Sequence, residues 1–292
     1  MILDTQIHFW EAERPDRPWR PDRTPSLPFP FGPEHFLPLM DAAGVDRAII
    51  VPPGIMGSDN RYALEVAARF PNRFAVMGLI DAQAPDIDQR VARWRLQPGM
   101  LGIRIHLHAA ERATWPHEWA LDPFWDACER YRVPVAVFVA GDVEVLRPIL
   151  ERFPTLKLIV DHLGLPQIDV SSVHPNLPAL LALERFPNVA VKLSTLPSRS
   201  KRGYPFPDVH DLVRAVIETF GPRRCFFGSD HTQQLARKRA TYHEEVDLFR
   251  VALPFLSDED RTWILGRAAA DYLGWPPDVP STALARGGDL TC

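Results

Sequence analysis

Eight short runs of apolar and β-branched residues recur along the chain, and amphipathic stretches with helical spacing separate them. The runs cover residues 2–6, 47–51, 74–80, 101–107, 133–139, 156–161, 188–193 and 224–228. Strands that alternate with helices pair in parallel, because a parallel neighbour is reached only through a crossover connection. The near-continuous apolar character of the runs also indicates strands that are covered on both faces.

The stretches with helical spacing complete this pattern. They lie at 35–43, 61–70, 87–95, 123–131, 143–153, 178–186 and 209–220, and a last one at 258–273 follows the eighth run. Eight strand–helix units in about 275 residues match the size of a (β/α)8 TIM barrel. A doubly wound open sheet is the alternative, but no GxGxxG or P-loop motif follows any of the runs. We therefore expect an α/β protein with one barrel over residues 1–275.

Two segments lack any periodicity. Residues 10–33 are rich in Pro and Arg, and they form an irregular loop at the carboxyl end of the first predicted strand. Residues 276–292 have the composition of a disordered tail.

Composition excludes several classes of protein. The chain has 3 cysteines (Cys128, Cys225 and Cys292) and no CxxC pair, which excludes a disulfide scaffold and favours a reducing, cytoplasmic compartment. No apolar run approaches the roughly 20 residues that span a bilayer, and the N-terminus lacks the features of a signal peptide. The net charge of -4 argues against a nucleic-acid partner.

Polar residues stand at the carboxyl ends of the predicted strands, where a barrel builds its active site. They are Gln6 and His8 on the first strand, Arg104 and His106 on the fourth, Asp161 and His162 on the sixth, Lys192 and Ser194 on the seventh, and Asp230 and His231 after the eighth. Strand alternation places Gln6 with His8 on one side. Ionisable groups in apolar strands cost free energy unless they are paired or solvated, so their repeated occurrence at one end predicts a functional site.

The motifs that contain these residues resemble a known family. DTQIHFW (4–10), GVDRAIIV (44–51), DNRYALEVAARFPNRF (59–74), GIRIHL (102–107), VDHLGLP (160–166), VKLS (191–194) and FGSD (227–230) occur in the order of that family. The chain resembles, over about residues 1–275, the lactonase-rich amidohydrolase 2 branch of the amidohydrolase superfamily. This branch includes sugar-acid lactonases, a pyrone-dicarboxylate lactonase and a sulfomuconolactone hydrolase. The resemblance implies a distorted TIM barrel that hydrolyses a lactone or a related carboxyl derivative.

The same resemblance implies roles for three residues. Asp230 is expected to be the general base that activates water, and His8 and His162 are expected to polarise the carbonyl or to bind a metal. The chain departs from the family at Gln6, where the usual Asp-x-His-x-His pattern has a histidine. His8, His162 and Asp230 could give three ligands to zinc or manganese, whereas some lactonases of the branch work without metal. The sequence therefore leaves two alternatives for the site: one bound divalent metal, or no metal.

The remaining polar residues predict a small, anionic lactone as the substrate. The candidate substrate-binding residues are Gln6, Trp10, Arg104, His106, Lys192, Ser194, Arg199 and His231. Two loops add positive charge: the loop after the seventh strand carries Arg199, Lys201 and Arg202, and the first loop carries Arg14, Arg17, Arg20 and Arg23. Guanidinium groups suit carboxylate and sulfonate, although loop arginines are also common as solvated surface residues.

We therefore expect a hydrolase that acts on a carboxylic ester bond, and two rival functions remain. One is a metal-dependent decarboxylase of the same superfamily, and the other is a non-catalytic barrel in which Gln6 marks a decayed site. The joint presence of His8, His162 and Asp230 argues against decay. A serine hydrolase is disfavoured because the chain has no GxSxG motif. Exposed helices of a barrel often mediate dimers, so a homodimer is one option.

Overall fold

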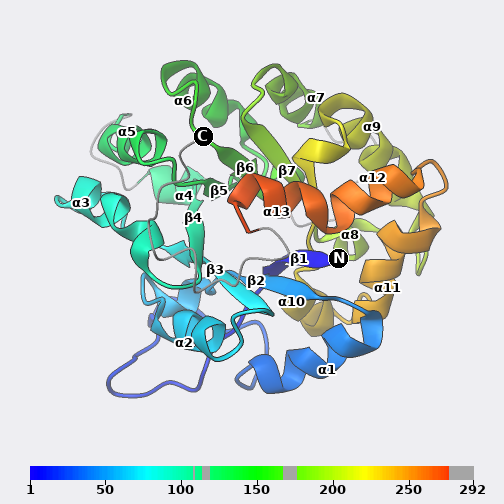
Figure 1. The fold of residues 1–292 in the computed structure, drawn as a ribbon, viewed down its shortest axis with the longest axis horizontal. Coiled ribbons are helices and arrows are strands. Elements are labelled where there is room, and N and C mark those ends of the chain that lie inside the picture. Colours follow the sequence, from blue (N-terminus) through cyan, green and yellow to red (C-terminus); the bar gives the residue numbers. More distant parts are fainter. Residues whose placement is uncertain (108, 114–118, 167–175, 276–292) are drawn as a thin grey trace.

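The structure is a computed structural model, and it describes residues 1–107, 109–113, 119–166 and 176–275. Eight strands form one parallel sheet in the order β1 to β8, and helices surround it (Figure 1). The strands are β1 Leu3–Ile7, β2 Arg47–Ile50, β3 Phe74–Leu79, β4 Met100–His106, β5 Val135–Phe138, β6 Leu158–Val160, β7 Val189–Leu193 and β8 Cys225–Phe227. The predicted (β/α)8 architecture is confirmed, and the predicted tail at 276–292 lies outside the described residues.

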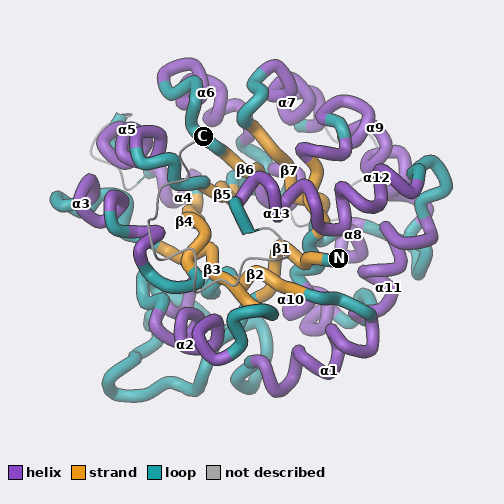
Figure 2. Tube along the Cα trace, viewed as in Figure 1, coloured by secondary structure: helices purple, strands orange, loops and turns teal. Residues whose placement is uncertain are grey.

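The helices form the outer ring of the barrel (Figure 2). The α-helices are α1 Pro33–Ala43, α2 Arg61–Arg69, α3 Ile87–Ala92, α4 Ala109–Arg112, α5 Asp122–Arg130, α6 Leu146–Arg152, α7 Leu177–Leu181, α8 Leu196–Arg199, α9 His210–Phe220, α10 His231–Arg237, α11 Tyr242–Asp247, α12 Asp258–Thr262 and α13 Ala268–Leu273. The 3-10 turns are η1 Gly54–Met56, η2 Trp94–Leu96, η3 Val143–Val145, η4 Asp161–Gly164, η5 Ala182–Arg185, η6 Pro207–Val209 and η7 Pro222–Arg224, and the π turns are η8 Leu248–Ala252 and η9 Trp263–Arg267. The sequence did not predict α8, α10 and α11, because helices of four to seven residues show too few turns for a periodic pattern.

An apolar layer fills the amino-terminal end of the barrel. Each strand contributes at least one fully buried residue to it: Leu3, Ile49, Ala75 and Met77, Leu101, Ala136, Ile159, Ala190 and Phe226. The small residues of α13 and the rings of Trp263 and Trp275 belong to the same cluster. The last helix therefore closes this end, and the side chains nearer the carboxyl ends of the strands are left to form a site.

A bulge in β1 decides which of its residues point into the barrel. The pairing of β1 with β2 shifts register between Asp4 and Ile7. Leu3 belongs to the interior cluster, whereas Ile7 and Phe9 pack in the larger cluster beneath the outer helices. Because the extra residue changes the alternation, Gln6 and His8 face the interior above Leu3.

Side chains of β1 join it to β8. Within the described residues, strand ladders connect each consecutive pair from β1 to β8, and no ladder joins β8 back to β1. Instead, Thr5 Oγ1 donates to the carbonyl of Phe227 at 2.7 Å, and the amide of Asp230 donates to the carbonyl of Gln6 at 2.9 Å. The carboxylate of Asp4 accepts from the amide of Ser229 at 2.9 Å and from its hydroxyl at 2.6 Å. The barrel is thus closed at this seam by the side chains of Asp4 and Thr5 and by one backbone hydrogen bond.

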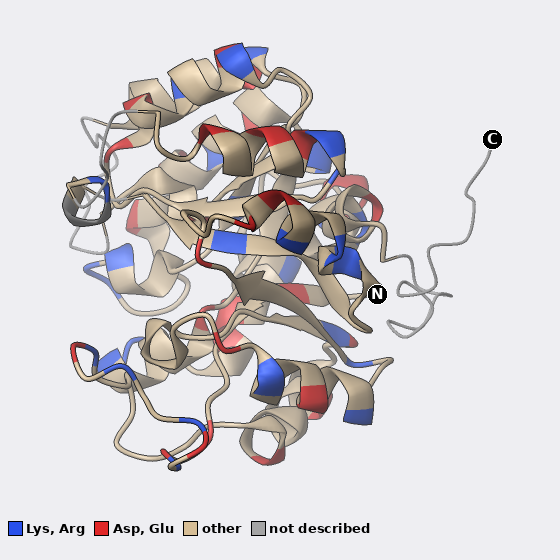
Figure 3. Ribbon diagram, turned by 90° about the vertical axis from the view of Figure 1, so that its left-hand side faces the viewer, with Lys and Arg blue, Asp and Glu red and all other residues tan. Residues whose placement is uncertain are grey.

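Acidic and basic side chains are mixed along the outer helices (Figure 3). None of the helices in the described part of the chain is long and apolar enough to cross a membrane. Cys128 and Cys225 are free and buried, whereas Cys292 lies outside the described residues. The cytoplasmic location stays a prediction.

The packing of β4 predicts a stability effect at Gly102. A Cβ atom there would lie 2.5 Å from the backbone oxygen of Pro134 and 2.9 Å from the side chain of Met77. Gly102→Ala is therefore expected to lower the free energy of unfolding by about 1–3 kcal/mol in urea denaturation. The matched control is Gly203→Ala, because a Cβ at Gly203 would meet no atom within 4 Å. Equal stability of the two variants would contradict the close packing of β4 against the β4–β5 connection.

Candidate active site

Three charged side chains form a buried layer directly above the apolar core. The carboxylate of Asp161 lies 3.0 Å from Lys192 Nζ and 3.2 Å from Arg104 Nε. All three residues are at most 5% exposed. Burial by itself would raise the pKa of Asp161, but the charges of Lys192 and Arg104 outweigh it and hold the pKa below its usual range. This layer therefore holds one more positive than negative charge.

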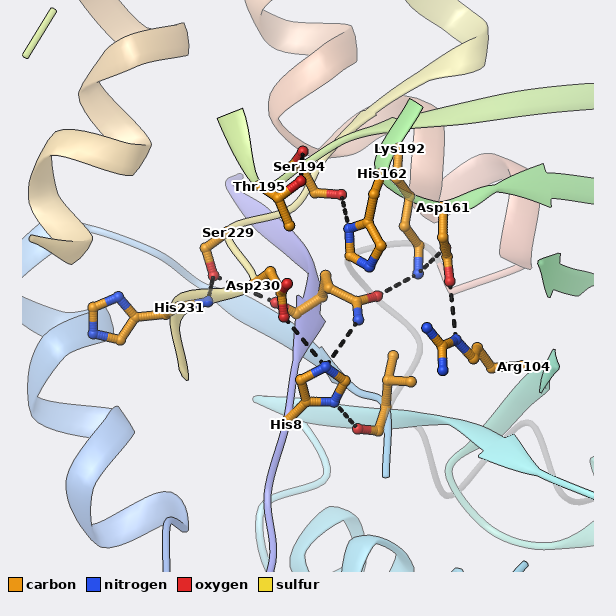
Figure 4. A network of polar contacts seen from close by, with 12 residues as sticks. His8, Arg104, Asp161, His162, Lys192, Ser194, Thr195, Ser229, Asp230 and His231 are labelled. Atoms are coloured by element: carbon orange, nitrogen blue, oxygen red, sulfur yellow. Dashed lines mark hydrogen bonds and ion pairs between the residues drawn. The ribbon is translucent and has the colours of Figure 1, made fainter. Parts of the chain in front are cut away.

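Lys192 also orients Gln6. Its ammonium group donates a hydrogen bond to Gln6 Oε1 at 2.8 Å. This contact identifies Oε1 as the acceptor and turns the amide nitrogen toward His8, where Gln6 Nε2 lies 3.4 Å from His8 Nε2. The amide of Gln6 thus connects the charged layer to the histidine of the first strand (Figure 4).

The tautomer of His8 follows from its backbone contact. His8 Nδ1 lies 2.7 Å from the carbonyl oxygen of Val51, and a carbonyl only accepts, so Nδ1 carries the hydrogen. Its Nε2 then faces the interior and lies 3.2 Å from Asp230 Oδ1. A base and an imidazole nitrogen that can exchange a proton are therefore adjacent at the barrel axis.

Asp230 presents a carboxylate that no protein group solvates. Both of its carboxylate oxygens are buried, and neither accepts a hydrogen bond from a donor among the described residues. Its backbone is left-handed, with φ of 57°, and its amide is bonded to Gln6 of the neighbouring strand. Because a buried carboxylate needs donors, this one has acceptor capacity for the hydroxyl group of a water or a substrate.

Left-handed backbone recurs where consecutive strands end. Ala140, His162, Thr195 and Asp230 follow β5, β6, β7 and β8, with φ of 47°, 54°, 60° and 57°. This conformation costs a residue other than glycine about 1–2 kcal/mol. Strained residues that cluster at one end of a fold mark a functional site, and here they mark the end that carries His162 and Asp230.

His162 is held as a neutral imidazole. Burial lowers its pKa to about 4, against the opposing charges of Asp230 and Asp161. Its Nδ1 lies 2.8 Å from Ser194 Oγ, which leaves Nε2 on the inner side of the ring. Its backbone carbonyl accepts a hydrogen bond at 2.9 Å from the buried guanidinium of Arg199, which also donates to Leu165 and Pro166.

The structure brings most of the predicted site residues together. Gln6, His8, Arg104, His162, Lys192, Ser194 and Asp230 surround one point at the barrel axis, and the predicted role of each stays a prediction. His106 lies beside this cluster, with its Nε2 in contact with Arg104 Nη1.

Three predicted substrate-binding residues lie elsewhere. Arg199 faces backbone carbonyls of the loop after β6, and its side chain is fully buried there. His231 points away from the cluster and pairs with Glu245 at 3.0 Å; burial lowers the pKa of His231 to about 4 and raises that of Glu245. Trp10 packs on Phe31, with ring centroids 6.2 Å apart. The substrate-binding role of these three residues stays a prediction. Arg199 and His231 follow the left-handed residues Thr195 and Asp230, so strand alternation does not predict their direction.

Sequence reasoning missed the role of Asp4. Its buried carboxylate accepts a hydrogen bond from the backbone N–H of Gln6 at 3.0 Å and another from the Tyr242 hydroxyl at 3.1 Å. These add to its two contacts with Ser229. Burial raises its pKa to about 6 despite these hydrogen bonds. The only sequence signal was an acidic residue at the start of an apolar strand, two positions before Gln6.

The donor set does not fit a metal ion of the predicted kind. Among the described residues, no three His, Cys, Asp or Glu side chains converge in a way that could hold one. The hydrogen bond from Gln6 Nε2 is directed at the nitrogen lone pair of His8 that a metal would need. The ammonium group of Lys192 supplies positive charge next to Gln6. We therefore derive no step through a metal.

Comparison with known proteins identifies relatives. A model of the amidohydrolase family matches residues 3–275. An L-fucono-1,5-lactonase of Burkholderia ambifaria is 31% identical over 232 residues, which cover 78% of this chain and 79% of that protein. A 4-sulfomuconolactone hydrolase of Hydrogenophaga intermedia is 27% identical, covering 90% of this chain and 85% of that protein. The crystal structure of an amidohydrolase from Burkholderia multivorans with bound zinc has a TM-score of 0.78 and 26% identity, covering 94% of this chain and 100% of that one.

The burial of Asp4 predicts a pH-dependent effect of Asp4→Asn. Because the folded-state pKa of about 6 lies above the ordinary aspartate pKa of 3.8, ionisation of Asp4 weakens the fold as pH rises from 4 through 6. Asn cannot ionise, so the stability of Asp4→Asn relative to the parent protein should increase over this range by roughly 2–3 kcal/mol. Urea denaturation at pH 4, 5, 6 and 7 measures it. Asp16→Asn, at a side chain that is 65% exposed, is the control. A pH-independent difference for Asp4→Asn would show that Asp4 is not desolvated in the folded state.

Proposed function

The chain belongs to the amidohydrolase family, and from the geometry of its site we propose that it hydrolyses the ester bond of a small, anionic lactone. The observation that supports this most strongly is the buried carboxylate of Asp230, which has no donor among the described protein groups and lies 3.2 Å from His8. The named activities of two relatives, an L-fucono-1,5-lactonase and a 4-sulfomuconolactone hydrolase, support the same class of reaction.

Asp230 acts as the general base in this proposal. A water bound to its carboxylate loses a proton to Asp230 while its oxygen attacks the lactone carbonyl carbon. A general base positioned in this way typically raises the reaction rate by a factor of about 10²–10⁴. The burial of both carboxylate oxygens strengthens their interaction with the water, because little bulk solvent competes.

His162 polarises the carbonyl as a neutral donor. If Nδ1 accepts the hydroxyl hydrogen of Ser194, then Nε2 carries the hydrogen that points to the inner side. The lowered pKa keeps the ring neutral at pH 7, so it donates to the developing oxyanion without adding a full charge. The excess positive charge of the Lys192–Asp161–Arg104 layer stabilises the same oxyanion electrostatically.

His8 completes the transfer of the proton. The proton taken by Asp230 passes to His8 Nε2 across 3.2 Å, and the imidazolium returns it to the ring oxygen as the carbon–oxygen bond breaks. The products are a carboxylic acid and an alcohol on one open chain, with one water consumed, and the acid then releases its proton to the solvent. An alkoxide is a better leaving group than an amide nitrogen, so a lactone suits a site that lacks a strong metal hydroxide.

Alternative reactions have different products, which one assay separates. One relative is a D-galactarolactone isomerase, and a decarboxylase remains the rival function from the sequence. Nuclear magnetic resonance on L-fucono-1,5-lactone and on muconolactone distinguishes an opened chain from an isomerised ring. Evolution of carbon dioxide from aromatic acids is measured in parallel.

The role of Asp230 predicts the effect of Asp230→Asn. The amide cannot accept a proton, so turnover of the lactone should fall by about 10²–10⁴ while the fold is retained. A pH-indicator assay measures turnover and circular dichroism measures the fold. Asp271→Asn, at a side chain that is 55% exposed, is the control and should keep the parent rate. Turnover of Asp230→Asn near the parent rate would exclude Asp230 as the base.

The donor set predicts the effect of metal removal. Treatment with a chelator, followed by elemental analysis and the same assay, should leave the lactonase rate within about twofold, because the proposed steps use only side chains. About one equivalent of zinc or manganese with activity that follows it would contradict this proposal. That outcome would favour the metal alternative and a site like that of the zinc-bound relative.

A further inference from the structure

A cavity of about 400 Å³ lies at the carboxyl ends of β3 and β4. From β4 it is lined by Arg104 and His106, and from the first loop by Arg20 and Arg23. This volume falls in the range of pockets that hold small ligands. The cavity therefore places residues of the irregular first loop next to those of the barrel.

Arg104 connects this cavity to the candidate active site. It lines the cavity, and its Nε also lies 3.2 Å from Asp161 in the charged layer beneath the catalytic cluster. A ligand in the cavity therefore lies beside Arg104 and, through it, next to the charged layer. The described lining does not include Asp230, His8 or His162, so a lactone with one substituent in the cavity has to extend past Arg104 to bring its ring to the barrel axis.

The first loop is anchored at several points, so its arginines are presented on an ordered segment. Its base is closed by paired backbone hydrogen bonds of 2.9 and 3.1 Å between Trp10 and Phe31. Within it, Arg17 forms ion pairs with Glu11 and with Glu65 of α2. The amide of Arg20 donates to the carbonyl of Ile55 at 2.8 Å.

The aliphatic stem of Arg20 passes beside Gly57, the residue just after η1. Gly57 has a left-handed φ of 59°, and a Cβ there would lie 3.6 Å from the stem of Arg20, which is an ordinary van der Waals distance. Glycine therefore meets a backbone requirement at the point where the arginine stem crosses the chain.

The charges around the cavity favour an anion. Among the described residues, its lining contains three guanidinium groups and one carboxylate, that of Asp81. Asp22 pairs with Arg20 at 2.7 Å and with Arg23 at 3.6 Å, but it is 54% exposed. Exposed ion pairs contribute little stability, so an anionic ligand in the cavity can share or displace this contact.

We infer that Arg20 and Arg23 form an anion subsite that binds a carboxylate or sulfonate substituent of the lactone, remote from the carbonyl that reacts. This inference rests on the proposed function and assigns its substrate selectivity to the first loop. The alternative position, the loop after β7, is less suited, because Arg199 is committed to backbone carbonyls and because Arg199, Lys201 and Arg202 are not among the described residues that line the cavity. A neutral sugar lactone would gain nothing from Arg20 and Arg23.

The test compares muconolactone, whose side chain ends in a carboxylate, with its neutral methyl ester. In the double variant Arg20→Gln/Arg23→Gln, the KM for muconolactone should rise about tenfold or more, and the KM for the ester should change less than about twofold. Asp22→Asn removes a competing carboxylate, so it should lower the KM for muconolactone by about two- to fivefold. The control is Arg14→Gln, because Arg14 is on the same loop but pairs with Glu11 and Asp16 away from the cavity.

A binding measurement separates this inference from the proposed function. Calorimetric titration of muconolactone into Asp230→Asn protein reads affinity without turnover, alone and combined with Arg20→Gln/Arg23→Gln. Loss of affinity in the combined variant supports the subsite even if the parent protein opens no lactone, in which case only the proposed function fails. Equal changes for the acid and the ester, or an equal effect of Arg14→Gln, would overturn the subsite.

Discussion

The carboxylate of Asp4 is the contact on which the candidate site depends. It bonds the amide and hydroxyl of Ser229 and thereby joins β8 to β1, where no ladder connects the strands within the described residues. The residue that follows Ser229 is Asp230, whose amide bonds to Gln6. Asp230 and the strand that precedes His8 are therefore held in register by one buried acid. Its raised pKa indicates that the closure costs stability, and this cost is tolerated because it sets the geometry of the site.

The side chains that fill the barrel interior differ along its axis. They are apolar at the amino-terminal end and charged in the next layer, and the candidate site lies above that layer. The first layer is closed by α13, and the second contains Asp161 between Lys192 and Arg104. Two cations and one anion in a buried layer leave positive charge near the carboxylate of Asp230. In the proposed reaction, this positive charge stabilises the developing oxyanion.

How far the site could be predicted depends on where each residue stands in its strand. Arg104 and Lys192 lie inside strands and face the interior, whereas Gln6 faces it because of the bulge in β1. His231 and Arg199 lie beyond the strand ends, after the left-handed residues Asp230 and Thr195. A single left-handed residue redirects the chain, so the period of two no longer applies. The arginines of the first loop were candidates from their charge alone. Their position against β4 was not predictable, because the loop has no period from which a direction could be derived.

The sequence by itself determined the number and order of the strands, the end of the barrel that carries polar residues, and the set from which the catalytic groups come. Those properties are local, because they follow from hydrophobic periodicity and from residue types at strand ends. The tertiary structure alone decided that Asp4 closes the barrel, that Gln6 directs its amide hydrogen at His8, and that Arg20 and Arg23 meet Arg104 at one cavity. These contacts join residues far apart in the chain, and they depend on bulges and left-handed turns that leave no periodic signal.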